Sequence, residues 1–255
     1  MNAVLILVYR NIVASVSKVF LIWQIVFPII YIFIAGYSYS ALIDSHGVPL
    51  GNSNVPYPAY LAAGMIGFNM MNSCTVAGSI IWNDRRNGMF LQILVMPFAK
   101  MEYIFGNILT IMLMGLASAG LILLAGSPTL IGNAHPTLIG SLYALYALIG
   151  GAIFFGSVAI IISTRLKSNE GFNVIINSIF LFFSFASTAF YPTKGVSGVL
   201  GTAFYANPLT YIVDITRAGI FNQISTFTTI EAGIIAAFSS ITFFIATQSM
   251  LKMKV

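Results

Sequence analysis

The sequence predicts an all-α integral membrane protein with six transmembrane helices, and two observations carry that prediction. The first is composition: of 255 residues, 58% are hydrophobic and only 7% are charged, with a mean hydropathy of +0.94. A soluble globular chain carries roughly 25% charged residues, so this composition argues against a soluble enzyme, a disordered chain and a disulfide-rich secreted domain. The second is the division of the chain into apolar stretches, each long enough to cross a bilayer.

Charges and turn residues delimit six such stretches. A helix that rises 1.5 Å per residue crosses a hydrocarbon core of about 30 Å with about 20 residues, and each stretch reaches that length. The expected spans cover residues 19–43, 57–82, 103–125, 137–164, 171–191 and 230–251.

The basic residues orient the spans. If the N-terminus is cytoplasmic, only Lys194 and Arg217 fall on the outer side, and all the other basic residues fall inside. Because Lys and Arg concentrate on the cytoplasmic side, we expect a multi-pass protein of the plasma (cytoplasmic) membrane with both termini cytoplasmic. The same rule accounts for the net charge of +5 without nucleic acid as a partner. The inner residues are Arg10, Lys18, Arg85, Arg86, Lys100, Arg165, Lys167, Lys252 and Lys254.

Residues 1–18 precede the first span. The pattern of residues 2–18 within this segment predicts an amphipathic helix. Asn11, Ser15 and Lys18 recur at helical spacing among apolar residues. We therefore expect an N-terminal interfacial helix on the inner membrane surface, with this polar stripe toward the cytosol. The alternative is that the segment extends the first span.

Residues 83–100 join spans two and three. The charged run Asn83-Asp84-Arg85-Arg86-Asn87 leads to Gly88, which can end a helix, and Pro97 ends the segment that follows. The helix between Gly88 and Pro97 is too short to span and too apolar to lie free in water. It is expected to rest on the membrane surface or to dock into another protein.

Residues 191–222 form an external piece before the last span. Glycines and the dipeptide Asn207-Pro208 interrupt it, and the apolar stretch 196–206 is too short to span. This pattern predicts an external re-entrant or interfacial hairpin buried against neighbouring helices. Asp214 and Arg217 are three residues apart on the helix that follows, so they can pair or point together to water.

Uncharged polar residues within the spans are the candidates for a transport pathway. Asn69 and Asn72 lie in span two, and Asn173 and Asn177 share one face of span five. Asparagines in spans more often form hydrogen bonds between helices, worth about 0.6–2 kcal/mol each. The spans contain almost no ionisable residue, which weakens the case for a proton-coupled carrier.

Signatures of catalysis and of metal binding are weak in this sequence. It has no G-x-x-x-x-G-K-[ST] loop to hold the phosphates of ATP. His46 and His135 lie far apart in predicted external loops, so no metal site is predicted. The single cysteine, Cys74, lies in an apolar stretch and is interpreted as a packing residue.

The three non-spanning pieces together resemble the ABC-2 type permease family, the membrane subunits of one class of ABC transporters. The resemblance covers nearly the whole chain, 1–255, as one transmembrane domain. The most specific match is Phe190-Tyr191-Pro192 followed by Asn207-Pro208-Leu209-Thr210-Tyr211 and Asp214-x-x-Arg217. The other matches are Arg10-Asn11, Pro28, Tyr60-Leu61-Ala62-Ala63-Gly64-Met65-Ile66, and Arg85-Arg86-Asn87-Gly88 through Leu94-Val95-Met96-Pro97, Tyr103 and Gly106.

The resemblance implies a half-transporter that is not itself an enzyme. Two six-span permease chains, as a homodimer or heterodimer, would form the pathway among membrane lipids. Two separate ABC ATPase subunits would bind ATP and Mg and power export of a hydrophobic or amphipathic substrate (drug, lipid or glycan-like), so no cofactor is expected in this chain. Within the family the chain is most similar to the drug-exporter (daunorubicin-resistance-like) branch, with polysaccharide exporters close behind.

The resemblance also assigns residues to two sites. The N-terminal helix and the coupling loop 83–100, with its cytoplasmic coupling helix, would contact the ATPase through Arg10, Asp84, Arg85, Arg86, Gly88, Phe90, Leu91, Leu94 and Pro97. The external hairpin would be formed by Tyr191, Pro192, Asn207, Pro208, Tyr211, Asp214 and Arg217.

One departure and two alternatives stay open at this point. Family members often place Glu in the charged turn, where this chain has Asp84, and the ion pairing of that turn is left undetermined. An ATP-independent channel or secondary carrier is the main alternative function. A membrane scaffold or enzyme is the other.

Overall fold

The computed structural model describes residues 3–15, 18–40, 47–51, 53–89, 92, 100–166, 168–192 and 198–252. These residues form helices almost throughout, apart from two short strands. The helices are α1 (Ala3–Ser15), α2 (Lys18–Ser40), α3 (Tyr57–Ser73), α4 (Thr75–Arg86), α6 (Lys100–Ala125), α7 (Ser127–Leu130), α8 (Leu138–Arg165), α9 (Asn169–Phe185), α10 (Val199–Ala206), α11 (Pro208–Ile220) and α12 (Thr226–Leu251); the strands are β1 (Val48–Leu50) and β2 (Ser53–Val55).

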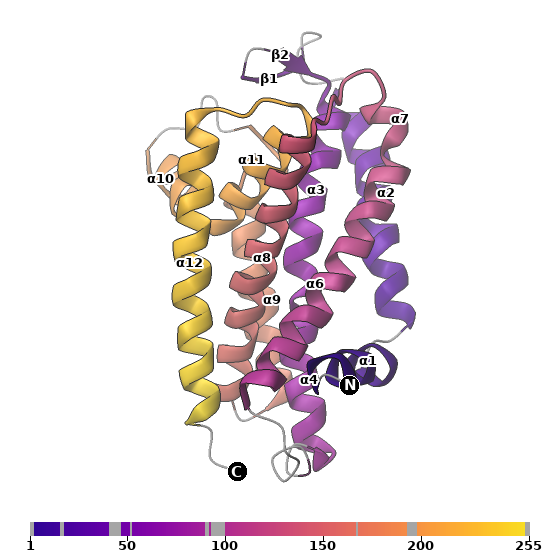
Figure 1. The fold of residues 1–255 in the computed structure, drawn as a ribbon. Helices are drawn as coiled ribbons and strands as arrows, with labels where there is room; N and C mark the ends of the chain where they lie inside the picture. Colours follow the sequence, from indigo (N-terminus) through magenta and orange to yellow (C-terminus); the bar gives the residue numbers. More distant parts are fainter. Residues whose placement is uncertain are drawn as a thin grey trace.

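The long helices run side by side along one axis and form a bundle (Figure 1). Both chain termini lie at the same end of this bundle. At the opposite end, β1 and β2 pair as an antiparallel hairpin in which Val48 faces Val55. Helix α8 lies centrally, because it packs against α4, α6, α11 and α12.

Within the described residues, four helices are long and apolar enough to cross a membrane: α2 over Ile22–Ser40, α6, α8 and α12. The chain is therefore a multi-pass membrane protein with these four candidate spans. The remaining two expected spans correspond to shorter helices. Span five is α9, which has 17 residues, and span two is divided between α3 and α4.

The expected span 57–82 forms two helices rather than one, with the interruption at Cys74. The side chains on either side of the break bond to their own helix. Ser73 Oγ donates to the Asn69 carbonyl at 2.8 Å, and Thr75 Oγ1 donates to the Asn72 carbonyl at 2.9 Å. Such bonds compete with the helical ladder and bend helices, and here they flank the break.

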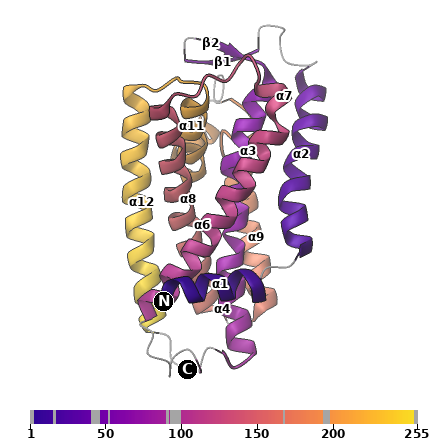
Figure 2. The same cartoon turned by 45° about the vertical axis from the view of Figure 1, so that its right-hand side comes forward.

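Helix α1 lies across the end of the bundle that carries both termini (Figure 2). The prediction that the polar stripe of this helix faces the cytosol is wrong for Asn11, which is fully buried against the bundle. The exposed side of α1 is apolar instead and includes Leu5, Tyr9 and Val13. An apolar outer face suits a helix that lies in a membrane interface.

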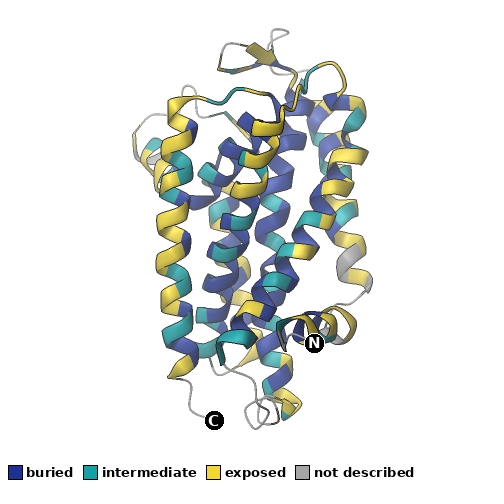
Figure 3. Ribbon diagram, in the orientation of Figure 1, coloured by how far each residue is buried: buried dark blue, intermediate teal, exposed yellow. Residues whose placement is uncertain are grey.

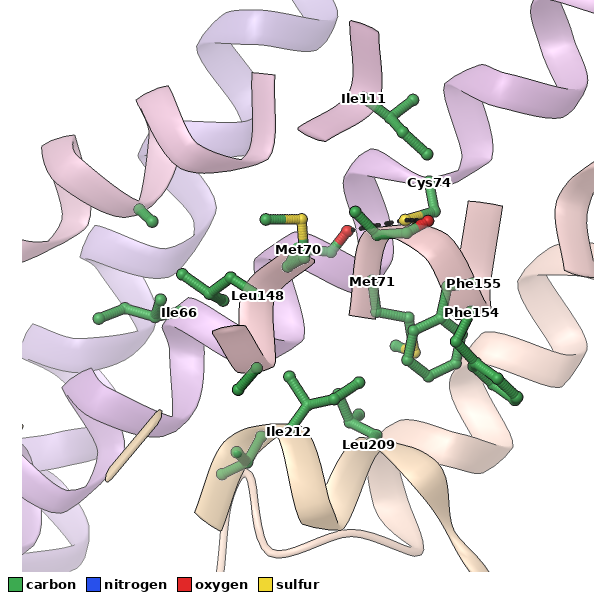
Figure 4. Close-up of a cluster of buried hydrophobic side chains, with 14 of the residues drawn as sticks. Ile66, Met70, Met71, Cys74, Ile111, Leu148, Phe154, Phe155, Leu209 and Ile212 are labelled. Atoms are coloured by element: carbon green, nitrogen blue, oxygen red, sulfur yellow. Dashed lines mark hydrogen bonds between the residues drawn. The ribbon is translucent and has the colours of Figure 1, made fainter. Parts of the chain in front are cut away.

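Burial is concentrated in the centre of the bundle, where α3, α8 and α11 meet, whereas α2 and α12 are largely exposed (Figure 3). Cys74 is fully buried in this core, close to Met70, Ile111 and Phe155 (Figure 4). Its interpretation as a packing residue is confirmed, and its thiol donates to the Met70 carbonyl at 3.2 Å.

Candidate functional site

A groove between α2, α3 and α9 is the best candidate for a pathway. It consists of two adjoining cavities of about 300 and 420 Å³, which share Phe27, Phe68 and Asn72 as lining residues. Its walls are mainly aromatic: Tyr31 and Phe68 each meet the ring of Phe190 edge-on, with centroids 5.2 and 5.4 Å apart. Such a surface suits flat or branched apolar molecules.

Three of the four asparagines predicted to line a pathway contribute to this groove. Asn69 and Asn72 come from α3, and Asn177 comes from the facing side of α9. Asn173 is exposed one turn away on α9 but lines neither cavity. The amide of Asn72 donates to the Phe68 carbonyl at 3.1 Å, so it is held within its own helix.

Gln24 also lines the groove, and sequence reasoning missed it. It is buried, and its amide nitrogen donates to Ser73 Oγ. Its carbonyl oxygen and the amide nitrogen of Asn69 are both buried without a hydrogen-bond partner among the described residues. A buried, unsatisfied polar atom costs about 1–3 kcal/mol, so these two atoms lower the stability of the packing of α2 on α3. A lone Gln inside an apolar stretch was the available signal.

A second polar cluster attaches α1 to the bundle at the end that carries the termini. Arg10 Nη2 lies 2.7 Å from Asp84 Oδ2, at the last turn of α4, and the two form an ion pair. The Tyr103 hydroxyl of α6 donates to the same oxygen at 2.7 Å. The sequence left the ion pairing of the charged turn undetermined. In the structure, Asp84 of this turn forms an ion pair with Arg10 of the N-terminal helix.

Asn11 extends this cluster toward the core. Its carbonyl oxygen accepts from Arg10 at 2.7 Å, and its amide donates to Asn107 at 2.8 Å and to Thr110 at 3.2 Å. Because Asn11, Asn107 and Thr110 are all fully buried, the network connects α1 rigidly to α6. Sequence alone could not pair residues that are 96 positions apart.

The remaining residues assigned to the coupling loop are only partly described. The Arg85 guanidinium lies 4.9 Å from the Trp82 ring and donates to the Ser163 carbonyl of α8 at 3.3 Å, whereas Arg86 is exposed. Gly88 has φ of +67°, a left-handed conformation that ends α4 as expected. Phe90, Leu91, Leu94 and Pro97 lie outside the described residues.

A third cluster is centred on Arg217 of α11. This side chain is almost fully buried, with 1% exposed, and its guanidinium carbon lies 3.6 Å from the centroid of the Tyr60 ring in α3. Its amino groups donate to Asp214 at 3.0 Å and to the Thr188 carbonyl at 3.0 Å. Of the two arrangements left open for Asp214 and Arg217, the structure has the ion pair, and Arg217 does not point to water.

Asn207 joins the end of α9 to the start of α11. Its oxygen accepts from the Leu209 amide at 2.9 Å as a helix N-cap, and its amide donates to the carbonyls of Phe183 and Ala186. Pro208 is the first residue of α11, which is the position where helices accept proline best.

The other aromatic residues assigned to this region make local bonds. The Tyr191 hydroxyl donates to the Phe185 carbonyl at 3.1 Å, and the Tyr211 hydroxyl donates to the Tyr205 carbonyl. Pro192 is partly buried directly after Tyr191. Of the seven residues assigned to the external hairpin, Tyr191, Pro192 and Asn207 lie outside the helices, between α9 and α11. Pro208, Tyr211, Asp214 and Arg217 lie in α11 itself.

Metal chemistry finds no support in the described part of the chain, where no group of three or more His, Cys, Asp or Glu residues could hold an ion. His135 is exposed in the loop before α8, and His46 lies outside the described residues. The groove has no ionisable lining residue except the Tyr31 phenol.

A family model described as ABC-2 type transporter matches residues 2–221, which is most of the chain. A search among curated proteins found no match.

Proposed function

Because the chain belongs to the ABC-2 type transporter membrane family, we propose that it is a permease subunit that exports a hydrophobic or amphipathic substrate along the α2–α3–α9 groove. The membrane domain of this family lacks an ATPase domain. Energy would therefore come from separate ABC ATPase subunits, two per complex, which bind the ATP and Mg.

The observation that carries this proposal is the polar surface of α9. Asn173, Asn177 and Ser178 are exposed on a helix whose exposed residues further along, Leu181, Phe182 and Phe185, are apolar. An amide that faces lipid leaves hydrogen-bonding groups unsatisfied at a cost of several kcal/mol. This face therefore needs a cover of another protein chain or of water, and a pathway between two permease chains supplies both.

The topology that we propose has six spans, with α3 and α4 together forming the second and α9 the fifth. Both termini would be cytoplasmic in the plasma membrane, because Arg10, Arg85, Arg86 and Arg165 lie at the end of the bundle that carries the termini. The second permease chain would be an identical or a related copy. Among the family's branches, we favour the drug exporters over the polysaccharide exporters.

Coupling would pass through the ion pair of Arg10 with Asp84. This pair joins the N-terminal helix to the charged turn that precedes residues 90–99, and the Tyr103 hydroxyl fixes the same carboxylate. A push by an ATPase on the loop 83–100 would therefore move α1, α4 and α6 together. The exposed Arg86 would contribute to the ATPase contact itself.

Purification of the chain together with its ATPase partner, followed by reconstitution into liposomes, tests the proposal. Candidate drugs, lipids and glycolipids are screened for stimulation of ATP hydrolysis. For a stimulating compound, Phe68→Ala should weaken the stimulation about tenfold, because it removes the ring at the junction of the two cavities. Thr242→Val on α12 is the control, since its hydroxyl bonds only within its own helix.

The main alternative is an ATP-independent channel or carrier. It predicts that the chain alone, without any ATPase, moves the compound across the liposome membrane at the same rate. That result, or the failure of any ATPase to copurify, would refute the proposed function.

A further inference from the structure

A basic cavity lies on a different side of the molecule from the groove. It measures about 480 Å³ and is formed where the last turns of α8 and α12 meet α4. Three of its eight lining residues are cations, Arg85, Arg165 and Lys252, and none is acidic. The ends of α4, α8 and α12, which contribute its lining residues, lie at the end of the bundle that carries the termini (Figure 1).

The three cations of this cavity have no carboxylate partner in the described part of the chain. The two ion pairs formed there join Arg10 to Asp84 and Asp214 to Arg217. Arg85 is nevertheless held in place, because its guanidinium lies over the Trp82 ring and bonds to the Ser163 carbonyl. Among the residues that the structure describes, no carboxylate therefore neutralises the positive charge at the cavity.

The cavity is amphipathic in a way that matches a lipid. Thr164 and Ser249 contribute hydroxyl groups, which lie 2.6 Å apart and bond to each other, so that α8 and α12 are joined at this point. Phe244 and Ile245 lie one to two turns before Ser249 in α12, and they are 64% and 42% exposed. A ligand held by the cations would therefore lie beside an apolar surface that faces the bilayer.

We propose that this cavity binds the phosphate headgroup of an anionic phospholipid from the surrounding leaflet, with an acyl chain along Phe244 and Ile245. Basic pockets between transmembrane helices are a known arrangement for such headgroups, and each Lys or Arg near the surface contributes about 1 kcal/mol. The phosphodiester, with one negative charge, would offset part of the positive charge of Arg85, Arg165 and Lys252 and hold α4 against α8 and α12. This inference depends on membrane insertion but not on the transported substrate.

Lipid binding to the purified full-length chain tests the proposal. Phosphatidylglycerol and phosphatidylcholine are titrated in mild detergent at 150 mM salt, and bound lipid is counted by native mass spectrometry. The double variant Arg165→Gln/Lys252→Gln should bind phosphatidylglycerol about 30-fold more weakly, as expected for the loss of two surface charges. The variant Arg165→Lys/Lys252→Arg keeps both charges and should bind as the original chain does.

Two further arms separate a lipid from a free phosphate. Glycerol phosphate, which has the headgroup but no acyl chain, should compete at least a hundredfold less well than phosphatidylglycerol. Phe244→Ala should weaken phosphatidylglycerol binding several-fold and leave glycerol phosphate unaffected. Equal binding of the two phospholipids, unchanged binding in the glutamine variant, or competition by glycerol phosphate at lipid concentrations would each overturn the proposal. Melting curves measured without added lipid verify that both double variants are folded. We expect both to be folded, because Arg165 and Lys252 are exposed.

Discussion

Gly64 lies where α3 passes the turn that follows α9. A Cβ atom at this position would come within 2.2 Å of the Ala189 carbonyl oxygen and 2.8 Å of an Arg217 amino group. Both neighbours are held by other contacts. Arg217 is stacked on Tyr60 and bonded to the Thr188 carbonyl, and the Ala189 amide donates to the Ser187 hydroxyl. Because Gly64 has no side chain, α3 can lie close to the turn after α9 and to the buried Arg217 side chain.

The substitution Gly64→Ala should destabilise the protein by about 1–3 kcal/mol, because the added methyl group forces backbone apart in a packed region. Gly120→Ala in α6 and Gly233→Ala in α12 are matched controls, since a Cβ at either position meets nothing within 4 Å. Both controls should be neutral or slightly stabilising, because alanine favours helix by about 0.5–1 kcal/mol over glycine. Thermal unfolding of the three purified variants measures the difference. Equal melting temperatures for Gly64→Ala and Gly233→Ala would contradict this account.

At this scale, sequence supplied residue types but not their environments. Asp214 and Arg217 were recognised as a potential pair because they are close along one helix. The stacking of Arg217 on Tyr60, 157 positions away, follows only from the packing of α11 on α3. Similarly, Asn69 and Asn177 were candidate pathway residues, but their position in one groove depends on how α3 and α9 pack.

Among the helices, α1 shows how a short element is fixed by a polar contact. One apolar side of α1 is directed outward, whereas Leu7, Val8 and Asn11 are buried against the bundle, where Asn11 bonds Asn107 and Thr110. Loss of Asn11 removes the donor that the Asn107 carbonyl oxygen accepts from, and loss of Asn107 leaves the Asn11 amide with Thr110 alone. A buried polar atom that loses its partner costs about 1–3 kcal/mol. Replacement of both by apolar residues removes that penalty.

We therefore expect Asn11→Leu and Asn107→Leu each to lower the free energy of unfolding by about 1–3 kcal/mol, and the double variant to lose less than the sum. The double-mutant cycle, measured by thermal unfolding, gives a coupling energy that isolates this contact. Asn133→Leu, whose amide bonds only the Thr129 carbonyl of the adjacent turn, serves as the control. Simple additivity of the two single variants would show that α1 is held by other contacts.

The elements themselves could be predicted to different degrees. Apolar length identified α2, α6, α8 and α12 directly, and helical spacing placed α1 over 2–18, against Ala3–Ser15 in the structure. The break at Cys74 was missed, although the Ser-Cys-Thr run that bonds to its own backbone was visible. The hairpin of β1 and β2 was also missed, because each strand has only three residues and no periodicity can be read from so short a run.

For the whole molecule, the distribution of polar surface separates two exposed sides. Helices α2 and α12 both face outward, because only 22% and 17% of the most apolar stretch of each helix is buried. The two helices lie on opposite sides of the bundle (Figures 1 and 2). Beside α2, the exposed surface of α9 carries Asn173 and Asn177. Lipid can cover apolar side chains at no cost, but it cannot satisfy amides. The α2–α9 side is therefore the one that requires a protein or water cover.

This asymmetry predicts where the second permease chain lies. A photo-crosslinking amino acid at position 181 of α9 should give a product of two permease chains in intact membranes, and mass spectrometry should identify an identical or related permease. The matched control is position 241 of α12, because Leu181 and Ile241 have the same exposure of 59%. Irradiation there should label lipid and yield little dimer. A stronger dimer product from position 241 than from position 181 would place the partner on the α12 side and leave the asparagines of α9 without the cover that the groove requires.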